Sequence, residues 1–276
     1  MFILLNGKYT AAGDPVLKPD NRAFRYGDGL FETMRFTNGQ IRLWDLHTAR
    51  LWKSLEWLGY SIPALFTPDA LKQEITGLLA KNKQKGDARI RLTVFRGNGG
   101  LYDPGTGLQY LIESWPLERE TGLNSNGLVT GIYPLARKST DPLAGIKSAS
   151  FLPYAMAALY AKENKLNDCF VLNTADTIAD STIANLFIRK GNRYSSPGPE
   201  QGAVDGVMRR YLIGRMREAG MEIYEEPVSA GQLSGADEVF LTNAVRGIRW
   251  VQRCGEAEYT PGQVTEIYRQ FMQTIP

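Results

Sequence analysis

The hydrophobic pattern of the first half of the chain opens with short strand-like runs. Phe2–Leu5 forms one run, and Phe31–Phe36 is joined through Asn38-Gly39 to a further run at Ile41–Trp44. An Asn-Gly pair between two apolar runs is a strong signal for a two-residue hairpin. We therefore expect Phe31–Phe36 and Ile41–Trp44 to be the two strands of a hairpin.

Helical periodicity follows this hairpin. Leu51, Leu55 and Leu58 recur at helical spacing, which predicts a helix from Asp45 as its cap to Gly59 as its stop. The rest of this half predicts one more helix and two strands: Pro68 to about Lys83, Ala88–Phe95 and Gln109–Glu113. This half of the chain is therefore expected to be α+β.

A polar stretch separates the two halves. Trp115–Gly127 breaks the periodicity and carries a proline and two glycines, which is typical of an interdomain connection. We expect a small α+β domain over residues 1–117, a linker over 118–127 and a larger, β-rich domain over 128–276. The elements predicted in the larger domain are strands at Leu128–Tyr133, Cys169–Leu172, Asn185–Ile188 and Glu238–Leu241, and helices at Pro153–Glu163, Gly206–Ala219 and Gln263–Met272.

Composition and charge exclude several classes of partner. The 276 residues carry 32 basic and 29 acidic side chains without a basic stripe, so nucleic acid is not an expected partner. Met1–Leu5 lacks a basic segment and is too short for a signal peptide or a membrane span. Cys169 and Cys254 are far apart, which argues against a disulfide framework or a thiolate metal site. We expect a cytoplasmic protein.

The chain has a single histidine, His47. Zinc sites rich in histidine are therefore excluded, and we expect no metal site. The sequence also has no GxSxG elbow, no SxxK nucleophile and no GK[ST] phosphate loop. Lysine, carboxylate and tyrosine remain as acid–base groups.

Lys147 is the strongest candidate for covalent chemistry. It lies within Ala144–Ser150, among small and apolar residues and without an acidic neighbour in sequence. Such surroundings favour the neutral amine, which is the form that attacks an aldehyde. The alternative is a solvated lysine in a loop before the helix predicted at Pro153.

Other polar groups suggest an anion or a cofactor. Asp180 precedes the strand that starts at Asn185, and Gly206 opens a helix whose N–H groups could close on a phosphate. Arg50 lies one helical turn after His47, so both side chains could point at one anion. The alternatives are a turn aspartate, an ordinary helix start and solvated surface side chains.

Together these pieces resemble the fold-type IV pyridoxal-phosphate enzymes, which include branched-chain and D-amino acid aminotransferases and 4-amino-4-deoxychorismate lyase. The similarity covers nearly the whole chain. The motifs recur in family order: Phe24–Thr33, His47 and Arg50, Arg96–Gly100, Lys147, Asp180–Phe187, the helix at Gly206, and Thr242-Asn243-Ala244.

The resemblance implies a two-domain fold similar to that of D-amino acid aminotransferase, with pyridoxal 5′-phosphate as cofactor. Lys147 would form the Schiff base and move the proton between Cα and C4′. Asp180 would face the pyridine nitrogen, although the family usually has glutamate there. The cofactor-binding residues that the resemblance implies are Arg50, Asp180, Asn185, Gly206, Val207, Met208, Thr242 and Asn243.

Family members are generally homodimers in which the partner subunit completes each site. The resemblance would place either Phe24–Phe31 or the Leu101–Thr106 loop across that interface.

The reaction is expected to be transamination between a small amino acid, of D configuration, and a 2-keto acid. The substrate-binding residues would be Arg25, Phe31, Thr33, Arg96 and Ala244. The branched-chain subclass is disfavoured because Thr33 stands where it has glycine. The D-amino acid pattern is incomplete, because Phe31 replaces its tyrosine and Asn98 its histidine.

The runner-up is the lyase, which releases pyruvate and 4-aminobenzoate. Thr33, Arg96–Gly100 and Asn243-Ala244 are similar to lyase sequences, whereas Leu101 stands where lyases tend to have arginine. A non-catalytic binding protein is a distant third. The sequence leaves the donor, the acceptor and the D or L preference open.

Overall fold

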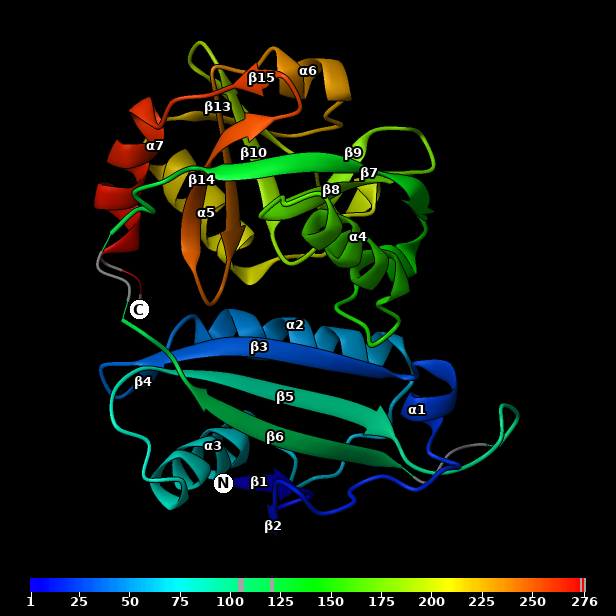
Figure 1. The fold of residues 1–276 in the computed structure, drawn as a ribbon. Coiled ribbons are helices and arrows are strands. Elements are labelled where there is room, and N and C mark those ends of the chain that lie inside the picture. The colour runs from blue at the N-terminus through cyan, green and yellow to red at the C-terminus, as the bar shows by residue number, and fades with distance from the viewer. Residues whose placement is uncertain (104–106, 120–121, 274, 276) are drawn as a thin grey trace. The chain divides into compact units, whose positions relative to one another are not determined.

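The computed structural model describes residues 1–103, 107–119, 122–273 and 275. Two compact units share the chain: Met1–Arg119 with Lys147–Ser150, and Glu120–Ile146 with Phe151–Pro276. Both units combine helices with sheet, as expected of an α+β protein (Figure 1). Of the helices that the structure describes, none has the length and apolar character that crossing a bilayer requires.

The first unit is built on a six-stranded sheet in which every pairing is antiparallel. Its strands, in spatial order, are β2 (Lys8–Ala11), β1 (Phe2–Leu5), β6 (Leu108–Pro116), β5 (Ala88–Arg96), β3 (Gly29–Thr37) and β4 (Gln40–Ile41). Its helices are α1 (Arg22–Tyr26), α2 (Trp44–Trp57) and α3 (Pro68–Lys81). The core is apolar, and the side chains of Leu55, Leu78, Ile90 and Ile112 are fully buried.

The predicted hairpin is confirmed, but its second strand is shorter than expected. Asn38 and Gly39 have φ values of 50° and 80°, the left-handed conformation that a type I′ turn requires. Strand β4 ends at Ile41, so a strand continuing to Trp44 was a wrong prediction. Leu43, at a φ of 54°, turns the chain into α2, and this helix begins at Trp44 without the predicted side-chain cap from Asp45.

The segment Lys147–Ser150 belongs to this first unit because it pairs with the start of β3. Phe31 N donates to Lys147 O at 3.0 Å, and Ala149 N donates to Gly29 O at 2.8 Å. These bonds flank an antiparallel bridge between Leu30 and Ser148. The backbone of Lys147 is therefore fixed against the strand that carries Phe31 and Thr33.

The second unit contains a nine-stranded mixed sheet, with β7 parallel to β8 and to β14, and β11 parallel to β12. Its strands in spatial order are β12 (Glu222–Glu225), β11 (Arg193–Ser196), β10 (Asn185–Lys190), β13 (Glu238–Asn243), β14 (Gly247–Cys254), β7 (Leu128–Lys138), β8 (Asp168–Asn173) and β9 (Ile178–Ser181), with β15 (Ala257–Glu258) beside β14.

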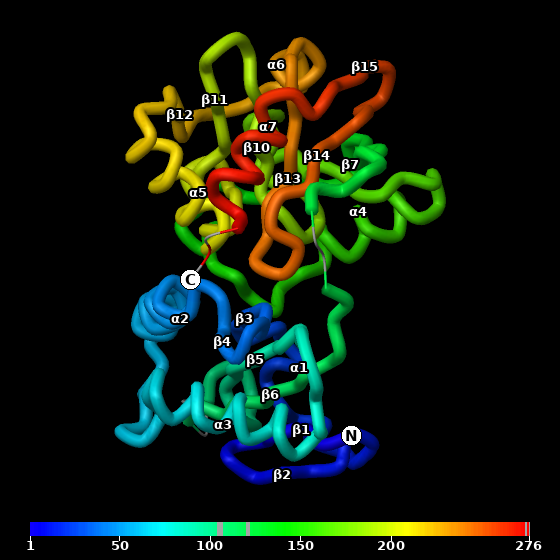
Figure 2. Tube along the Cα trace, turned by 90° about the vertical axis from the view of Figure 1, so that its left-hand side faces the viewer, coloured from blue at the N-terminus to red at the C-terminus, as the bar shows by residue number. Residues whose placement is uncertain are grey.

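Helices lie on both sides of these strands. Figure 2 shows α4 (Leu152–Glu163) and α5 (Val207–Glu218) at opposite sides of them. The remaining helical segments are α6 (Ala230–Ser234), α7 (Gly262–Ile267), the 3₁₀ turns Pro142–Gly145 and Pro199–Gln201, and a π-helical turn, Tyr268–Met272. One apolar cluster includes Phe170, Leu186, Leu241 and Val251, and a second packs α4 against β7 and β8.

The predicted strands and helices of the second half are present, most of them somewhat longer or shorter than expected. The helix expected over Gln263–Met272 changes to π-helical geometry after Ile267. The pattern missed the strand β14 and several shorter elements: β2, β9, β11, β12, β15, α1 and α6. Of the linker predicted over 118–127, residues 120 and 121 lie outside the described residues.

Candidate active site

The first turn of α5 offers backbone N–H groups without a side-chain cap. Its N-cap is Gly206, which has no side chain to accept from them. Val207 and Met208 follow with buried side chains. The first N–H groups of a helix have no partner within the helix and carry the positive end of its dipole. This end of α5 is therefore suited to an anion.

Asn185, the first residue of β10, supports this turn. Its Nδ2 donates to Val204 O at 2.8 Å. A Cβ placed on Gly206 would lie 1.9 Å from Asn185 Oδ1, which is closer than two non-bonded atoms can approach. The close approach explains why the helix starts with glycine at this position.

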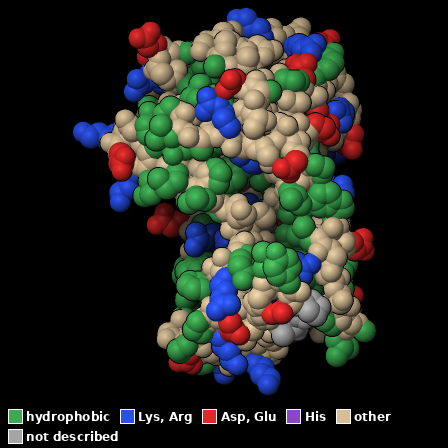
Figure 3. Space-filling model, turned by 90° about the vertical axis from the view of Figure 1, so that its right-hand side faces the viewer, with side chains coloured by type: hydrophobic (Ala, Val, Ile, Leu, Met, Phe, Trp, Pro, Cys, Tyr) green, Lys and Arg blue, Asp and Glu red, His purple; other side chains and the backbone are tan. Residues whose placement is uncertain are grey.

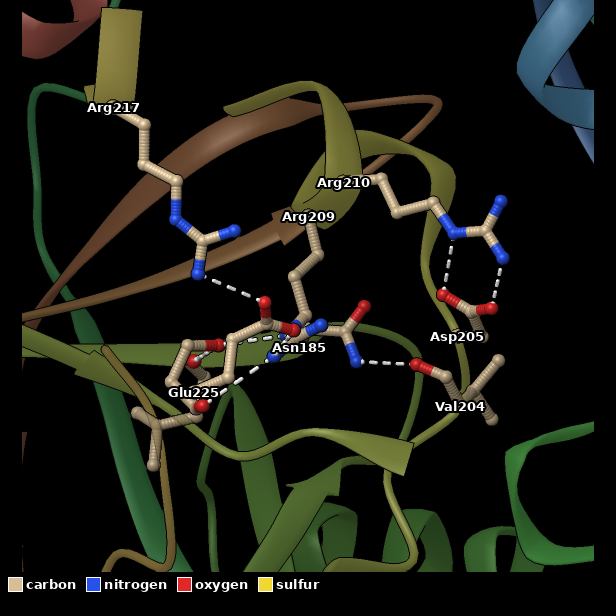
Figure 4. A network of polar contacts seen from close by, with 9 residues as sticks. Asn185, Val204, Asp205, Arg209, Arg210, Arg217 and Glu225 are labelled. Carbon is tan, nitrogen blue, oxygen red and sulfur yellow. Dashed lines mark hydrogen bonds and ion pairs between the residues drawn. The ribbon is translucent and has the colours of Figure 1, made fainter. Parts of the chain in front are cut away.

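Two arginines near the start of α5 fix the helix in place (Figure 4). Arg210 Nε donates to Asp205 Oδ1 at 2.7 Å, directly before the N-cap. Arg209 is fully buried and bonds Ser196 Oγ at 2.9 Å and Glu225 Oε2 at 2.9 Å. Such charge-assisted bonds are geometrically specific, so they hold the first turn in one orientation.

Thr242, the register partner of Asn185, has a buried hydroxyl without a hydrogen-bond partner among the described residues. It lies at the end of β13 and pairs in register with Asn185. The residue is 1% exposed, and its Oγ1 has no hydrogen-bond partner among the residues that the structure describes. A buried hydroxyl without a partner costs stability, so it indicates a ligand group.

The next residues form the turn from β13 to β14. Asn243 Oδ1 accepts from Val245 N at 3.1 Å and from Arg246 N at 2.8 Å. The side chain thus shapes the turn that contains the half-buried Ala244. Of the predicted cofactor residues, Asn185, Gly206 and Thr242 are brought together by direct approach or by strand register.

Asp180 on β9 is linked to the same turn through Val204. Val204 N donates to Asp180 Oδ2 at 2.9 Å, while its carbonyl accepts from Asn185. The backbone just after Asp180 is held by buried Asp168, which accepts from Thr182 N at 3.1 Å and also from Ser181 Oγ at 2.8 Å. The backbone of a single residue, Val204, therefore links Asp180 to the entry of α5.

In the first unit, Lys147 lies against an aromatic ring. Its Nζ is 4.5 Å from the centroid of the Phe31 ring, and the Arg91 guanidinium is 3.8 Å from the same centroid. Arg91 pairs in register with Thr33, so Phe31, Thr33 and Arg91 share one face of the sheet. Sequence reasoning missed Arg91, although its alternation with buried Ile90 and Leu92 could have placed it on that face.

Glu32, His47 and Arg50 form a buried cluster in the first unit. Arg50 Nε donates to Glu32 Oε1 at 2.8 Å, and His47 Nδ1 lies 2.6 Å from Glu32 Oε2. The sequence predicted that Arg50 and His47 could share one anion, and the structure supplies Glu32 as such a group. The contact between Arg50 and a phosphate stays a prediction.

Charges within this cluster set its protonation. Burial raises the pKa of Glu32, but Arg50 and His47 outweigh this effect and lower it to about 2. Burial lowers the pKa of His47 below its usual value. Glu32 acts to raise this pKa, but the positive charges of Arg50 and Lys147 add to the effect of burial. His47 is therefore neutral at pH 7 and donates its Nδ1–H to the Glu32 carboxylate. Its Nε2 has no partner among the described residues.

The two arginines predicted for the substrate carboxylate have other contacts. Arg96 Nη1 donates to Asp28 Oδ1 at 2.7 Å, and Nη2 donates to Leu58 O. Arg25 is exposed, and its Nε donates to Pro19 O at 3.1 Å. Of the loop predicted to cross a subunit interface, Leu101–Thr106, residues 104–106 lie outside the described residues.

Residues 29–254 match the family described as Amino-transferase class IV. The chain is 32% identical to an aminodeoxychorismate lyase of Bacillus subtilis (strain 168) over 93% of this chain and 88% of that protein. It is 26% identical to a D-alanine aminotransferase of Bacillus licheniformis, over 88% and 84% respectively. Its fold is similar to that of the branched-chain aminotransferase from the archaeon Thermoproteus uzoniensis solved with norvaline, with a TM-score of 0.88, 22% identity and coverage of 99% and 94%.

The steric requirement at Gly206 predicts the effect of adding one methyl group. Gly206→Ala forces Asn185 away and should lower the free energy of unfolding by about 1–3 kcal/mol, the usual cost of overpacking. Gly214→Ala is the matched control, because this glycine is exposed in the same helix and a Cβ there meets nothing. The control should be neutral or stabilising by up to about 1 kcal/mol. Urea unfolding checks both, and equal effects would contradict the close approach.

The lowered pKa of His47 predicts a loss of stability in mild acid. Below about pH 6.5 the unfolded chain gains a proton on this imidazole that the folded chain does not. The free energy of unfolding should therefore fall with a slope of at most about 1.4 kcal/mol per pH unit. His47 is the only histidine, so His47→Gln should remove this slope between pH 6.5 and 5. Parallel pH curves for both proteins would show that His47 titrates normally.

Proposed function

Because the chain belongs to the class IV aminotransferase family, we propose that it uses pyridoxal 5′-phosphate to exchange an amino group between a small amino acid, of D configuration, and a 2-keto acid. The observation that carries the proposal is the Thr242 hydroxyl, which has no partner among the described residues and is linked through Asn185 to the start of α5. A phosphate needs such convergent donors.

The residues proposed to hold the phosphate are mostly backbone donors. Val207 and Met208 would give their N–H groups, Thr242 its hydroxyl and Asn243 its backbone. The family resemblance also assigns Arg50 to the phosphate. This donor set suits a phosphate, because every group in it donates hydrogen bonds to an anion. Asn185 and Gly206 would shape the turn rather than bind the anion.

Lys147 is proposed as the catalytic residue. Bound pyridoxal phosphate supplies an electron sink for the bonds at the Cα of a substrate. The backbone of Lys147 is fixed by Phe31 N, and its Nζ lies over an aromatic face that cannot accept its proton in an ion pair. We propose that this amine holds the cofactor, removes the proton from the substrate Cα and returns it during the exchange.

The face of β3 and β5 is proposed to bind the substrate. Phe31 and Thr33 would contact it from β3, and Arg91 offers a guanidinium on the same face for the carboxylate. Arg91 supplements Arg25 and Arg96, since Arg96 already bonds Asp28 and Leu58 O. Ala244, in the turn after β13, would contribute a small side chain.

A second candidate is the elimination of pyruvate from 4-amino-4-deoxychorismate to give 4-aminobenzoate. It is favoured by the 32% identity to the Bacillus subtilis lyase. It is also favoured by the contacts of Arg96, because a D-amino acid carboxylate trap built on this residue would have to break them. Both reactions begin with removal of a Cα proton, so the proposed role of Lys147 is common to them.

We also propose that the chain forms a homodimer. Figure 3 shows hydrophobic side chains on the surface of the face that bears α4. Leu152, Met156 and Leu159 of this helix are 69%, 42% and 52% exposed, at spacings that place them on one side. An exposed apolar helix face is suited to a second copy of the chain. A monomer in sedimentation velocity at micromolar concentration would contradict this proposal.

A half-reaction separates the two activities. The protein loaded with pyridoxal phosphate is mixed with D-alanine or D-glutamate, and with their L forms, without keto acid. Loss of visible absorbance with formation of the pyridoxamine form supports transamination. An unchanged cofactor, together with release of pyruvate and 4-aminobenzoate from aminodeoxychorismate, would replace that proposal with the lyase.

The role of Lys147 predicts the effect of its removal. Lys147→Ala should abolish the visible absorbance and lower the rate of either reaction by about 10²–10⁴-fold, the usual contribution of an acid–base group. Lys18→Ala, an exposed lysine in the same unit, should leave both unchanged. A Lys147→Ala protein that retains the absorbance would move the catalytic role to another lysine.

A further inference from the structure

Asp180 is the centre of a buried network made by two other elements of the second unit and by the segment before α5. The residue is 2% exposed on β9. Tyr154 Oη, from α4, donates to both carboxylate oxygens, at 3.0 Å to Oδ1 and 2.8 Å to Oδ2. Val204 N donates to Oδ2 at 2.9 Å, and Lys138 Nζ, at the end of β7, lies 3.6 Å from the same oxygen.

The direction of the hydrogen bonds follows from the chemistry of Lys138. An ammonium group has donors and no acceptor. Lys138 Nζ donates to Tyr154 Oη and, at 3.4 Å, to Ala144 O. The phenol oxygen thus accepts from Lys138 and must donate its own proton to Asp180. Burial raises the pKa of Tyr154 well above its usual value, and the Asp180 charge adds to this effect, so the donor persists at neutral pH.

The network leaves one carboxylate oxygen with spare capacity. Oδ2 is approached by Tyr154, Val204 and Lys138, whereas Oδ1 is approached by Tyr154 alone among the described residues. Each carboxylate oxygen can accept about two hydrogen bonds. Oδ1 therefore keeps a site for an external N–H donor, such as a protonated pyridine nitrogen.

We propose that Tyr154 and Lys138 are positioning residues that fit a short carboxylate to the cofactor ring. Asp180 stands where the family resemblance expects glutamate, which is one methylene longer. The Tyr154 hydroxyl takes up space beside the carboxylate that the extra methylene of a glutamate would need, and it fixes the direction in which Oδ1 points. This inference rests on the proposed function, since it assigns a partner to the ring that Asp180 would face.

A double-mutant cycle tests the compensation directly. Tyr154→Phe, Asp180→Glu and the double variant are compared with the wild type by titrating each cofactor-free protein with pyridoxal phosphate and following absorbance. Each single variant should bind about tenfold more weakly, because a hydrogen bond to a charged group is lost or crowded. The double variant should return to within about threefold of the wild type, since the longer side chain fills the space of the hydroxyl.

Tyr160→Phe is the matched control on the same helix. Its hydroxyl makes no hydrogen bond within the described part of the chain, and its ring packs edge-on against Tyr133 at 5.6 Å. This variant should bind the cofactor as the wild type does. Thermal unfolding of the cofactor-free proteins shows whether each variant is folded. If Tyr154 had a purely structural role, Tyr154→Phe would lower the stability, and adding Asp180→Glu would not restore cofactor binding.

Two outcomes overturn the inference while the proposed function stands. One is cofactor binding by Tyr154→Phe that equals the wild type, and the other is a double variant weakened by the product of the single effects, about 100-fold. If the wild type itself shows no absorbance that Lys147→Ala removes, the proposed function fails and this inference fails with it. The two failures are therefore distinguishable from the same set of titrations.

Discussion

The rest of the candidate site depends on the N-terminus of α5, which has no side-chain cap and starts with a glycine packed against Asn185. A helix start with a side-chain cap would satisfy its own N–H groups and have little affinity for an anion. Here the cap residue is Gly206, and the space beside it is filled by Asn185 Oδ1. The same asparagine pairs in register with Thr242, whose buried hydroxyl has no partner in the described chain. Asn185 thus links the backbone donors at the start of α5 to the side-chain hydroxyl of Thr242.

Within the second unit, hydrogen bonds connect the start of α5 to Asp180. The backbone of Val204 accepts from Asn185 through its carbonyl and donates to Asp180 through its N–H, so the positions of the two side chains are coupled. Buried Asp168 holds the following backbone through Ser181 and Thr182. In the first unit, pairing with β3 fixes Lys147 in a similar way. In each unit, candidate groups therefore lie on strands, at a helix end or on a segment bonded to a strand, which are more rigid than free loops.

Local chemistry explains which parts of the structure the sequence could predict. The Asn38-Gly39 turn needs two left-handed residues, and its residue types indicate this. The strand predicted to continue to Trp44 was wrong because Leu43 adopts the left-handed conformation, which its residue type does not favour, and turns the chain into α2. Short strands such as β9 and β11 have too few residues to show periodicity. The α+β class and the family could be read from the order of motifs, whereas side-chain partners such as Glu32 for Arg50 depend on contacts made by folding.

The most direct test compares pyridoxal 5′-phosphate with pyridoxal, which lacks the phosphate, in binding to the wild type and to Thr242→Val. If the start of α5 and Thr242 hold the phosphate, the substitution should weaken binding of the phosphorylated cofactor by about tenfold and leave binding of pyridoxal unchanged. Equal weakening for both compounds, or no weakening for either, would contradict the account.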